Sequence, residues 1–560
     1  MPTAAFATAL RDAQFVDSLA RRHLRLGLEY YGAGRTEEAI DTFRLGVAAA
    51  ENATPGAESV ETISELHAKL GDASMLRGDF ELARTSYQTA LRMTPHLTDC
   101  WCGFGNLQLK AGNYQEAIAL FLQALRLNSC HWAARTSLVQ ALMATQQYIV
   151  AKAVLLELAG ERPQDGEIRH RLGKTCFELN EPEVAIECFR EAVALNPRDA
   201  DSINWIGALK QTMGDIEGAR AAYAEAARIR PLIRRPAARS PAEFRVLALY
   251  APFGGNTPTE YLLQDAFYDT DTLALLTARE YDGELFSETF QLIVNLISDA
   301  DQTEALLPVA ADLADRLGAP IVNHPRQIQR TTRDAVACLL QGIPGCRIPK
   351  ALRHKAGSES SPAALQAAFP FSSPVLARPV GTHGGDDFEK TEDPEALAAF
   401  LSQRPDHDHY LIEYIDYRSD DGYFRKYRFI FVDGQILPYH LCIGNDWKLH
   451  HISTDMAHQP WMQKEEEAFL NNPTGVFKPA HYQALHTIRE RIGLEYCGID
   501  CALDVSGNLV VFEANASMLV HERNEGFSYK TPAVQRIKLA FEAMLRKFAH
   551  PVEVRRVSAA

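Results

Sequence analysis

Residues Gly498 to Asn515 read Gly-Ile-Asp-Cys-Ala-Leu-Asp-Val-Ser-Gly-Asn-Leu-Val-Val-Phe-Glu-Ala-Asn. Apolar residues alternate with small or polar ones, Ser506-Gly507-Asn508 supplies a turn, and a short apolar run follows, so we expect two antiparallel strands. Such a hairpin brings Asp500 near Glu513 and Asn515, and the last two share one strand face because they are two residues apart. Hard oxygen ligands of this kind bind magnesium beside the phosphates of a nucleotide. A solvated strand face is the plainer alternative.

The chain has 560 residues, more than one hydrophobic core normally serves, so at least two domains are expected. Its formal net charge of −15 argues against a nucleic-acid partner or an anionic membrane surface. The N-terminus lacks a basic segment followed by an apolar core, and no apolar run approaches the length of a membrane span. We therefore expect a cytoplasmic protein. The 10 cysteines are scattered without metal-binding spacing, which is typical of reduced, packed thiols.

The first 231 residues repeat with a period of 34. Alanine recurs at this interval, at Ala83, Ala117, Ala151, Ala185 and Ala219. An aromatic residue or leucine follows four positions later, at Tyr87, Phe121, Leu155, Phe189 and Tyr223. In the first helix of four units a glycine without a side chain lets the paired helix approach closely, at Gly71, Gly105, Gly173 and Gly207. This is the pattern of tetratricopeptide repeats.

An earlier copy of the unit is marked by Ala39 and Phe43 and is separated from the others by a longer loop. The unit at 132–163 departs most from the pattern, with Val139 at the glycine position. We expect six helix pairs in an all-α superhelix over residues 1–231, whose concave face commonly binds peptides or proteins. A peptide, protein or carrier-bound substrate is one expected partner. The alternative, which the sequence does not rank below it, is that the repeats hold a homo-oligomer or the next domain.

Residues 232–243 break the repeat with prolines and arginines and are expected to be a linker. After this segment the sequence pattern changes to that of an α/β domain. Phe244 to Tyr250 and Gln291 to Ile297 are predicted buried strands, and Leu306 to Leu317 has helical spacing. Residues 244–322 are therefore expected to form an α/β subdomain.

Later segments carry further candidate binding residues. A passage from Asn323 contains a helical stretch and closes with Gly-Ile-Pro344. A strand from Phe371 ends in the cation Arg378 and is followed by glycines that let the backbone approach phosphates, namely Gly381, Gly384 and Gly385. Tyr410-Leu-Ile-Glu-Tyr-Ile415 reads as a core strand, and the segment from Tyr423 to Leu437, which includes Arg428, reads as a hairpin with an Asp-Gly turn.

In this order these segments resemble the ATP-grasp superfamily, and their sequence pattern is most similar to that of its glutathione synthetase and ribosomal-protein glutamate ligase branch. The resemblance implies an α/β (α+β) ATP-grasp fold over 323–550, followed by a tail at 551–560. It implies ATP and magnesium, or manganese, as cofactors, with Asp500, Glu513 and Asn515 as metal ligands. It further implies nucleotide contacts from Arg378, Gly381, Gly384, Gly385, Glu413, Tyr414 and Ile415, and a phosphoryl contact from Arg428.

The resemblance implies a carboxylate–amine ligase that forms an amide or peptide bond through an acyl phosphate and releases ADP. The substrates would be a carboxylate and an amine, and Lys448 and His450 are candidates for binding them, with a solvated loop as the alternative. The sequence departs from the family at Ala335, where a nucleotide-binding lysine is usual, and Arg330 or Arg333 are its alternatives. A kinase on the same scaffold and a non-catalytic repeat adaptor are the rival functions.

Two remaining segments have simpler readings. Arg425 and Lys426 lie close to Arg428 in sequence and are expected to face outward. The acidic segment from Pro460 to Pro473 is expected to be a solvent-facing helix.

Overall fold

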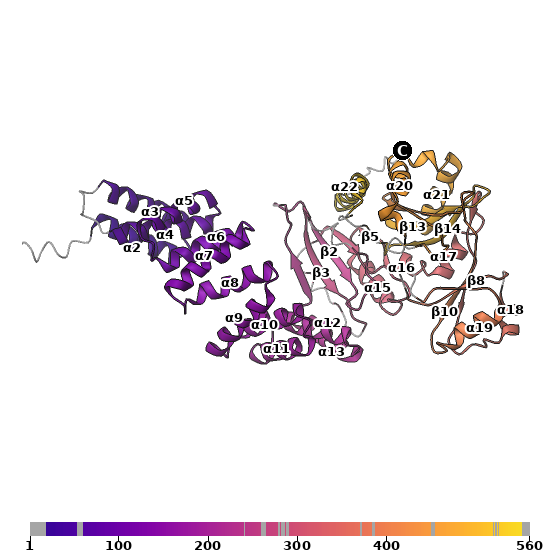
Figure 1. Ribbon diagram of the computed structural model, residues 1–560, viewed down its shortest axis with the longest axis horizontal. Coiled ribbons are helices and arrows are strands. Elements are labelled where there is room, and N and C mark those ends of the chain that lie inside the picture. The colour runs from indigo at the N-terminus through magenta and orange to yellow at the C-terminus, as the bar shows by residue number, and fades with distance from the viewer. Residues whose placement is uncertain are drawn as a thin grey trace, which may run out of the picture. The chain divides into compact units, whose positions relative to one another are not determined.

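A computed structural model describes residues 18–52, 60–239, 241–258, 265–277, 281, 286, 290–369, 372–382, 387–449, 454–518, 520, 524 and 526–550. The chain divides into two compact units, Met1–Ala222 and Tyr223–Ala560. The first is all-helical and the second contains mixed sheets (Figure 1). The expected order of an all-α superhelix followed by a region of helices and sheets is confirmed.

Twelve helices of the described chain form six consecutive pairs. They are α2 (Leu19–Gly32), α3 (Thr36–Glu51), α4 (Val60–Arg77), α5 (Phe80–Met93), α6 (Thr98–Lys110), α7 (Tyr114–Leu127), α8 (Trp132–Ala144), α9 (Tyr148–Glu161), α10 (Gly166–Glu178), α11 (Pro182–Leu195), α12 (Ala200–Thr212) and α13 (Ile216–Ile229). The repeated alanines are fully buried, as Ala83, Ala117 and Ala151 illustrate. The 34-residue period therefore marks the packing face of each helix pair.

The repeated glycines allow close helix approach, as the sequence predicts. A Cβ added at Gly105 would lie 2.5 Å from Cε1 of Phe121, whose ring is fully buried in α7. Gly71 and Gly173 have the same relation to Tyr87 and Phe189. In these three units the ring four positions after the alanine therefore occupies the space that a side chain would need.

The first sheet of the C-terminal unit has the order β1-β3-β2-β4-β5. Its strands are β1 (Leu232–Arg235), β2 (Arg245–Tyr250), β3 (Asp269–Ala274), β4 (Leu292–Asn295) and β5 (Ile321–Val322), and α15 (Leu307–Leu317) joins the last two. Strands β2 to β5 are parallel, whereas β1 pairs antiparallel with β3. Part of the segment expected to be a linker is thus an edge strand, because Leu232 to Arg235 complete the backbone hydrogen bonds of β3.

A second, four-stranded antiparallel sheet has the order β7-β10-β8-β9. It contains β7 (Ala351–His354), β8 (Val375–Pro379), β9 (Glu389–Thr391) and β10 (His409–Glu413), with α18 (Pro362–Ala368) and α19 (Pro394–Ser402) in its connections. Short helices α16 (Pro325–Ile328) and α17 (Arg333–Leu339) precede it. Leu365 of α18 and Leu397 of α19 pack with Leu411 of β10 in a small separate core.

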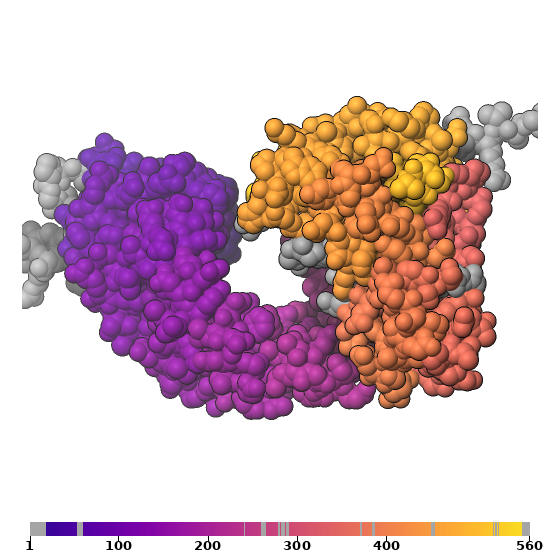
Figure 2. Space-filling model, turned by 45° about the vertical axis from the view of Figure 1, so that its right-hand side comes forward, coloured from indigo at the N-terminus to yellow at the C-terminus, as the bar shows by residue number. Residues whose placement is uncertain are grey.

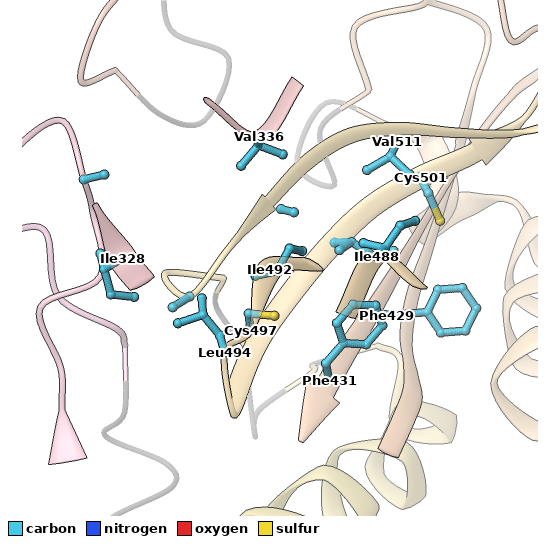
Figure 3. Close-up of a cluster of buried hydrophobic side chains, with 14 of the residues drawn as sticks. Ile328, Val336, Phe429, Phe431, Ile488, Ile492, Leu494, Cys497, Cys501 and Val511 are labelled. Carbon is cyan, nitrogen blue, oxygen red and sulfur yellow. The ribbon is translucent and has the colours of Figure 1, made fainter. Parts of the chain in front are cut away.

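The third sheet has the order β12-β11-β13-β14-β6. Its strands are β6 (Cys346–Arg347), β11 (Phe424–Val432), β12 (Gln435–Gly444), β13 (Tyr496–Leu503) and β14 (Leu509–Asn515). Strands β13 and β14 pair antiparallel, so the expected hairpin is confirmed. Alternation on β11 sends Phe429 and Phe431 to one core and Ile430 to another. Figure 3 shows the two phenylalanines gathered near Ile488 and Ile492 in the first of these cores.

Three long helices flank this sheet: α20 (Pro460–Asn471), α21 (Pro479–Ile492) and α22 (Thr531–Ala549). Helix α20 is not wholly solvent-facing, because Met462, Glu466 and Phe469 are buried along one side. Helix α22 packs on β11 and β12, and Figure 2 shows yellow C-terminal residues next to the orange segments that precede them. Among the described helices none has the length and apolar character needed to cross a bilayer.

Candidate functional site

A cavity with a volume of about 410 Å³ lies in the C-terminal unit. The structure brings most of the sequence-predicted site residues into its wall: Arg378, Glu413, Tyr414, Ile415, Arg428, Lys448, Asp500, Glu513 and Asn515. They come from strands β8, β10, β11, β13 and β14, from the two residues that follow β10, and from the segment that follows β12. Segments more than a hundred residues apart therefore meet at one site.

A row of charged side chains crosses the third sheet at this cavity. Arg428 of β11 is the register partner of Asp500 of β13, and Asp500 is the partner of Glu513 of β14. On the other side of Arg428 the row continues to His440 of β12. Register partners point to the same face of a sheet, so strand pairing alone assembles these groups.

Asp500 is held by cations. The Nε and Nη2 atoms of Arg428 donate to its two oxygens at 2.6 and 2.9 Å, and Nζ of Lys426 lies 3.4 Å away. Burial by itself would raise the pKa of Asp500, but the charges of Arg428 and Lys426 outweigh it and hold the pKa well below its usual range. The carboxylate is therefore ionised at neutral pH.

Glu513 accepts a hydrogen bond from Nη2 of Arg333 at 3.0 Å. Burial would raise the pKa of Glu513 and Asp500 adds to this, but Arg333, Arg378 and Arg428 together lower it. The amide nitrogen of Asn515 donates to Glu513, while the amide oxygen of Asn515 accepts from the backbone and hydroxyl of Ser517 at 3.0 Å.

This donor set fits a hard divalent cation in part. Asp500 and Glu513 are adjacent ionised carboxylates, the ligands that magnesium prefers. Asn515 turns its nitrogen, not its oxygen, toward Glu513, so its amide would have to rotate to join them. In the described part of the chain no three His, Cys, Asp or Glu side chains form a metal-binding group. The carboxylate pair therefore suits an ion that takes its other ligands from water or phosphate.

Cations gather around the carboxylates. Arg378 is only 4% exposed, donates to the hydroxyl of Thr382 at 3.0 Å and lies over the ring of Phe388 at 5.3 Å. Lys448 donates to the backbone oxygen of Phe388 at 3.1 Å. Lys426 does not face outward as expected; it lines the cavity because it is two residues from Arg428 on β11. Arg425, the residue before Lys426, instead pairs with Asp421 and Glu465.

The wall of the cavity also includes many apolar and aromatic side chains. These are Leu376, Phe388, Ile412, Tyr414, Ile415, Tyr417, Trp447, Leu449 and Phe512. Trp447 packs edge-to-face against Phe388 and Tyr414, with ring centroids 5.4 and 6.1 Å apart. The carboxylate of Glu413 accepts from the backbone nitrogen of Lys350 at 3.1 Å and lies 3.6 Å from Arg347. Glu413 is thus already engaged by the neighbouring segment.

Loops of the first sheet close the remaining side. Gly255 and Asn256 follow β2, and Asp299 and Gln302 follow β4. Because β3 and β4 lie on opposite sides of β2, these loops leave the sheet at its switch point, where open α/β sheets bind ligands. Gly255 has φ +76°, and a Cβ there would lie 2.6 Å from Thr303, so glycine is needed for the two loops to meet.

Some predicted residues lie elsewhere. Gly381 is outside the cavity wall, with its carbonyl accepting from Gln302 at 2.9 Å. Gly384, Gly385 and His450 fall outside the described residues. Arg333 lines the cavity beside the position where Ala335 replaces the usual lysine, whereas the guanidinium of Arg330 bonds to Gln327.

Sequence reasoning missed several residues of the wall. Lys426 could have been found from its two-residue spacing to Arg428 on one strand. Asp299 and Gln302 could have been found by their place after a buried parallel strand. Phe388 and Trp447 gave no local signal, because they reach the cavity from irregular segments between strands.

Comparisons with known proteins concern the helical part. A tetratricopeptide repeat family model matches residues 108–174, and a second matches residues 166–199. The curated protein Superkiller protein 3 of Schizosaccharomyces pombe is 26% identical over 113 residues, which are 20% of this chain. The match spans only 8% of that relative's length.

Among solved structures, the Pseudomonas aeruginosa protein pilF has 17% identity and a TM-score of 0.33, with 38% of this chain and 93% of that chain covered. MamA of Desulfovibrio magneticus RS-1 has 22% identity and a TM-score of 0.29, with 30% and 94% covered. YrrB, described as a TPR protein with an unusual peptide-binding site, has 21% identity and a TM-score of 0.28, with 30% and 86% covered.

The N-terminal unit therefore consists of tetratricopeptide repeats, a class of helical repeat typical of protein interaction. It is joined in one chain to a C-terminal unit of mixed sheets that encloses a charged cavity.

Proposed function

We propose that the C-terminal unit binds ATP and joins a carboxylate to an amine, releasing ADP, while the repeats bind a peptide, protein or carrier that bears a substrate. The observation that carries this proposal is the composition of one cavity. Its wall combines a group of apolar, aromatic side chains with two ionised carboxylates that are paired with cations. This combination matches a nucleotide, which is flat and weakly polar at its base and highly charged at its phosphates.

The aromatic side chains of the wall suit the base. They offer flat apolar surfaces, and ring faces stack favourably on a planar heterocycle. The strand β10 ends here at Glu413, and Tyr414 and Ile415 continue it, so backbone groups at the cavity edge can pair with the base. Because the carboxylate of Glu413 is engaged with Lys350, we assign base recognition to the backbone rather than to this side chain.

The charged side chains of the wall suit the phosphates. Arg378, Lys426, Arg428 and Lys448 supply positive charge in a cavity of a chain whose net charge is −15. Arginine can hold phosphate oxygens with two parallel hydrogen bonds, which makes Arg378 and Arg428 the strongest candidates. A magnesium ion on Asp500 and Glu513 would neutralise charge as the terminal phosphoryl group moves to a carboxylate.

The reaction needs no side-chain nucleophile. A carboxylate becomes reactive once it is phosphorylated, and an amine can then displace phosphate. The chain's own residues would bind the phosphates, orient the carboxylate beside them and keep water from the acyl phosphate. Lys448 and the loop after β4 both line the cavity and are candidates for placing the substrates.

An adaptor without catalysis remains a distinct second function, because the repeats are typical of protein interaction. One contact favours it: the two oxygens of Asp500 are both bonded to Arg428, so a metal must share them. Carboxylate oxygens have further lone pairs, which makes sharing feasible. An adaptor would bind no ATP, and a kinase would release ADP with the carboxylate alone.

The test uses the purified full chain. ATP binding is measured by calorimetry with and without magnesium, and ADP release is measured with N-acetylated amino acids as carboxylates and amino acid amides as amines, separately and together. The ligase proposal predicts ADP release only when both substrate types are present. Absence of ATP binding refutes it in favour of the adaptor, and ADP release from a carboxylate alone assigns a kinase. Arg378→Gln should weaken ATP binding, whereas the exposed control Arg316→Gln on α15 should not.

A further inference from the structure

A second cavity of about 60 Å³ adjoins the first beside Glu513. The two cavities share Asp299, Arg333 and Glu513 in their walls. A buried water needs 10–15 Å³ of such space, so this cavity has room for about four waters or for a head group of a few heavy atoms. It is too small for a nucleotide.

The charge of this cavity is predominantly negative. Asp299, Asp301 and Glu513 line it, and Arg333 is its single lining cation among the described residues. Arg333 is already engaged with Glu513. The hydroxyl of Tyr410 donates to Oδ1 and Oδ2 of Asp301, at 2.8 and 3.0 Å, and Nη1 of Arg353 lies 3.5 Å from Oδ1.

The neighbours of Asp301 do not neutralise it fully. Burial raises the pKa of Asp301, and the charges of Asp299 and Asp334 add to this against the opposing effects of Tyr410 and Arg353. A carboxylate in this position is stabilised by an additional cation. This effect supports the inference drawn from the cavity's shape and lining.

The cavity also has apolar side chains in its wall, and these decide which kind of cation fits. Val336, Ala337, Ile348 and Val511 line it. A bare metal ion prefers oxygen ligands all round, which this wall cannot supply. A primary ammonium on a short alkyl group places its N–H bonds on the carboxylates and its carbon on the apolar side chains.

We propose that the small cavity binds a primary ammonium group of about the size of methylammonium, either as a small amine or as the end of a longer one. Asp299 and Asp301 accept its N–H bonds, and Ala337 and Val511 contact its carbon. Its role as the amine substrate rests on the proposed function, because Glu513 forms a wall of both cavities. The binding itself does not depend on that function.

The test is equilibrium dialysis of the full chain against radiolabelled methylammonium at neutral pH, without ATP. We expect one saturable site per chain, which ammonium competes for and which potassium and the bulkier tetramethylammonium do not. Asp301→Asn keeps the size of the side chain but removes its charge, and should weaken binding about tenfold or more, as expected for a lost charge-assisted hydrogen bond. Ala337→Leu should abolish binding by filling the cavity from its apolar side.

Matched controls separate these effects from general damage. Asp315→Asn removes a carboxylate of α15 that pairs with Arg326, and Ala399→Leu adds the same bulk at an exposed position of α19. Both should bind methylammonium normally, and circular dichroism checks the folding of every variant. If Asp301→Asn unfolds, Ala337→Leu decides.

Absence of saturable binding, or equal binding by Asp301→Asn, Ala337→Leu and the wild type, overturns the proposal. Displacement by potassium overturns it in favour of a metal site. If methylammonium binds as described but no ATP-dependent ADP release is found, the proposed ligase function fails and the ammonium site stands. If ADP release is found with both substrate types but methylammonium does not bind, the ammonium site is refuted and the proposed ligase function stands.

Discussion

Replacing Gly105 with alanine should destabilise the repeat unit through one identifiable contact. The new Cβ would lie 2.5, 2.7 and 3.1 Å from Cε1, Cδ1 and Cζ of Phe121. Phe121 is fully buried, so its ring cannot move aside without displacing the core between α6 and α7. Overpacking of this kind costs about 1–3 kcal/mol, and the better helix propensity of alanine returns up to about 1 kcal/mol. The net expectation is a loss of up to about 2 kcal/mol.

Gly160 provides the matched control, because it is also helical and a Cβ there would meet nothing within 4 Å. Gly160→Ala should therefore be neutral or stabilise by up to about 1 kcal/mol. The assay is hydrogen exchange of the α6 and α7 amides in the full chain, together with urea unfolding followed by circular dichroism.

A double variant tests the assigned contact. Phe121→Leu removes the ring atoms nearest to the new Cβ, so it should make the Gly105→Ala change cheaper than it is in the wild type. Equal stability of the Gly105→Ala and Gly160→Ala chains would refute the packing argument, as would additive effects of Gly105→Ala and Phe121→Leu.

Four further predictions concern the C-terminal unit. Glu513→Gln should abolish magnesium-dependent ADP release, whereas Glu467→Gln, at an exposed position of α20, should leave it unchanged. Near-normal turnover of Glu513→Gln would reject the proposed metal site. Lys426→Met should weaken ATP binding in calorimetry by about ten- to a hundredfold, as for a lost charge-assisted contact, and unchanged affinity would place Lys426 outside the site. Glu466 is fully buried against His440, Lys530 and Tyr529, and although burial raises its pKa, these partners lower the pKa from 4.5 to about 2. Because a lowered pKa stabilises the fold at pH values above the pKa of the unfolded state, the free energy of unfolding should fall by about 3 kcal/mol as the pH falls from 4.5 toward 2. Glu466→Gln should lack this pH dependence in urea unfolding. A chain of residues 216–560 should be soluble and bind ATP. A chain of residues 242–560 lacks β1, so the edge of β3 is unpaired and the chain should aggregate, as measured by light scattering. Equal behaviour of the two chains would deny β1 a structural role.

Local pattern predicted much of this protein. The 34-residue period identified the helix pairs because alanine, glycine and an aromatic ring recur where each pair packs, and the buried Ala117 and Phe121 confirm this relation. The alternation around Ser506-Gly507-Asn508 predicted the β13–β14 hairpin for a similar reason, since a strand's period of two is visible in a short segment. Asp500 and Glu513 were thereby placed side by side before any long-range contact was known.

Other features depend on contacts between distant segments, and only the tertiary structure decided them. Residues 232–235 became a strand because β3 offered them an edge, although their own sequence reads as a linker. Glu466 lies buried on a helix that looks acidic and exposed, because His440 and Lys530 meet it from β12 and η5 (Ser528–Lys530). The pairing of Arg333 with Glu513 joins residues 180 positions apart.

The cavity itself shows the division most clearly. The sequence by itself determined which residue types are available for the proposed nucleotide site and which strands would carry them, because charge and hydrogen-bonding capacity belong to the side chain. The structure decided that Lys426 points inward, that Asn515 turns its nitrogen to Glu513 and that a small acidic cavity lies beside them. These outcomes depend on the volume left between three packed sheets, and no local segment encodes that volume.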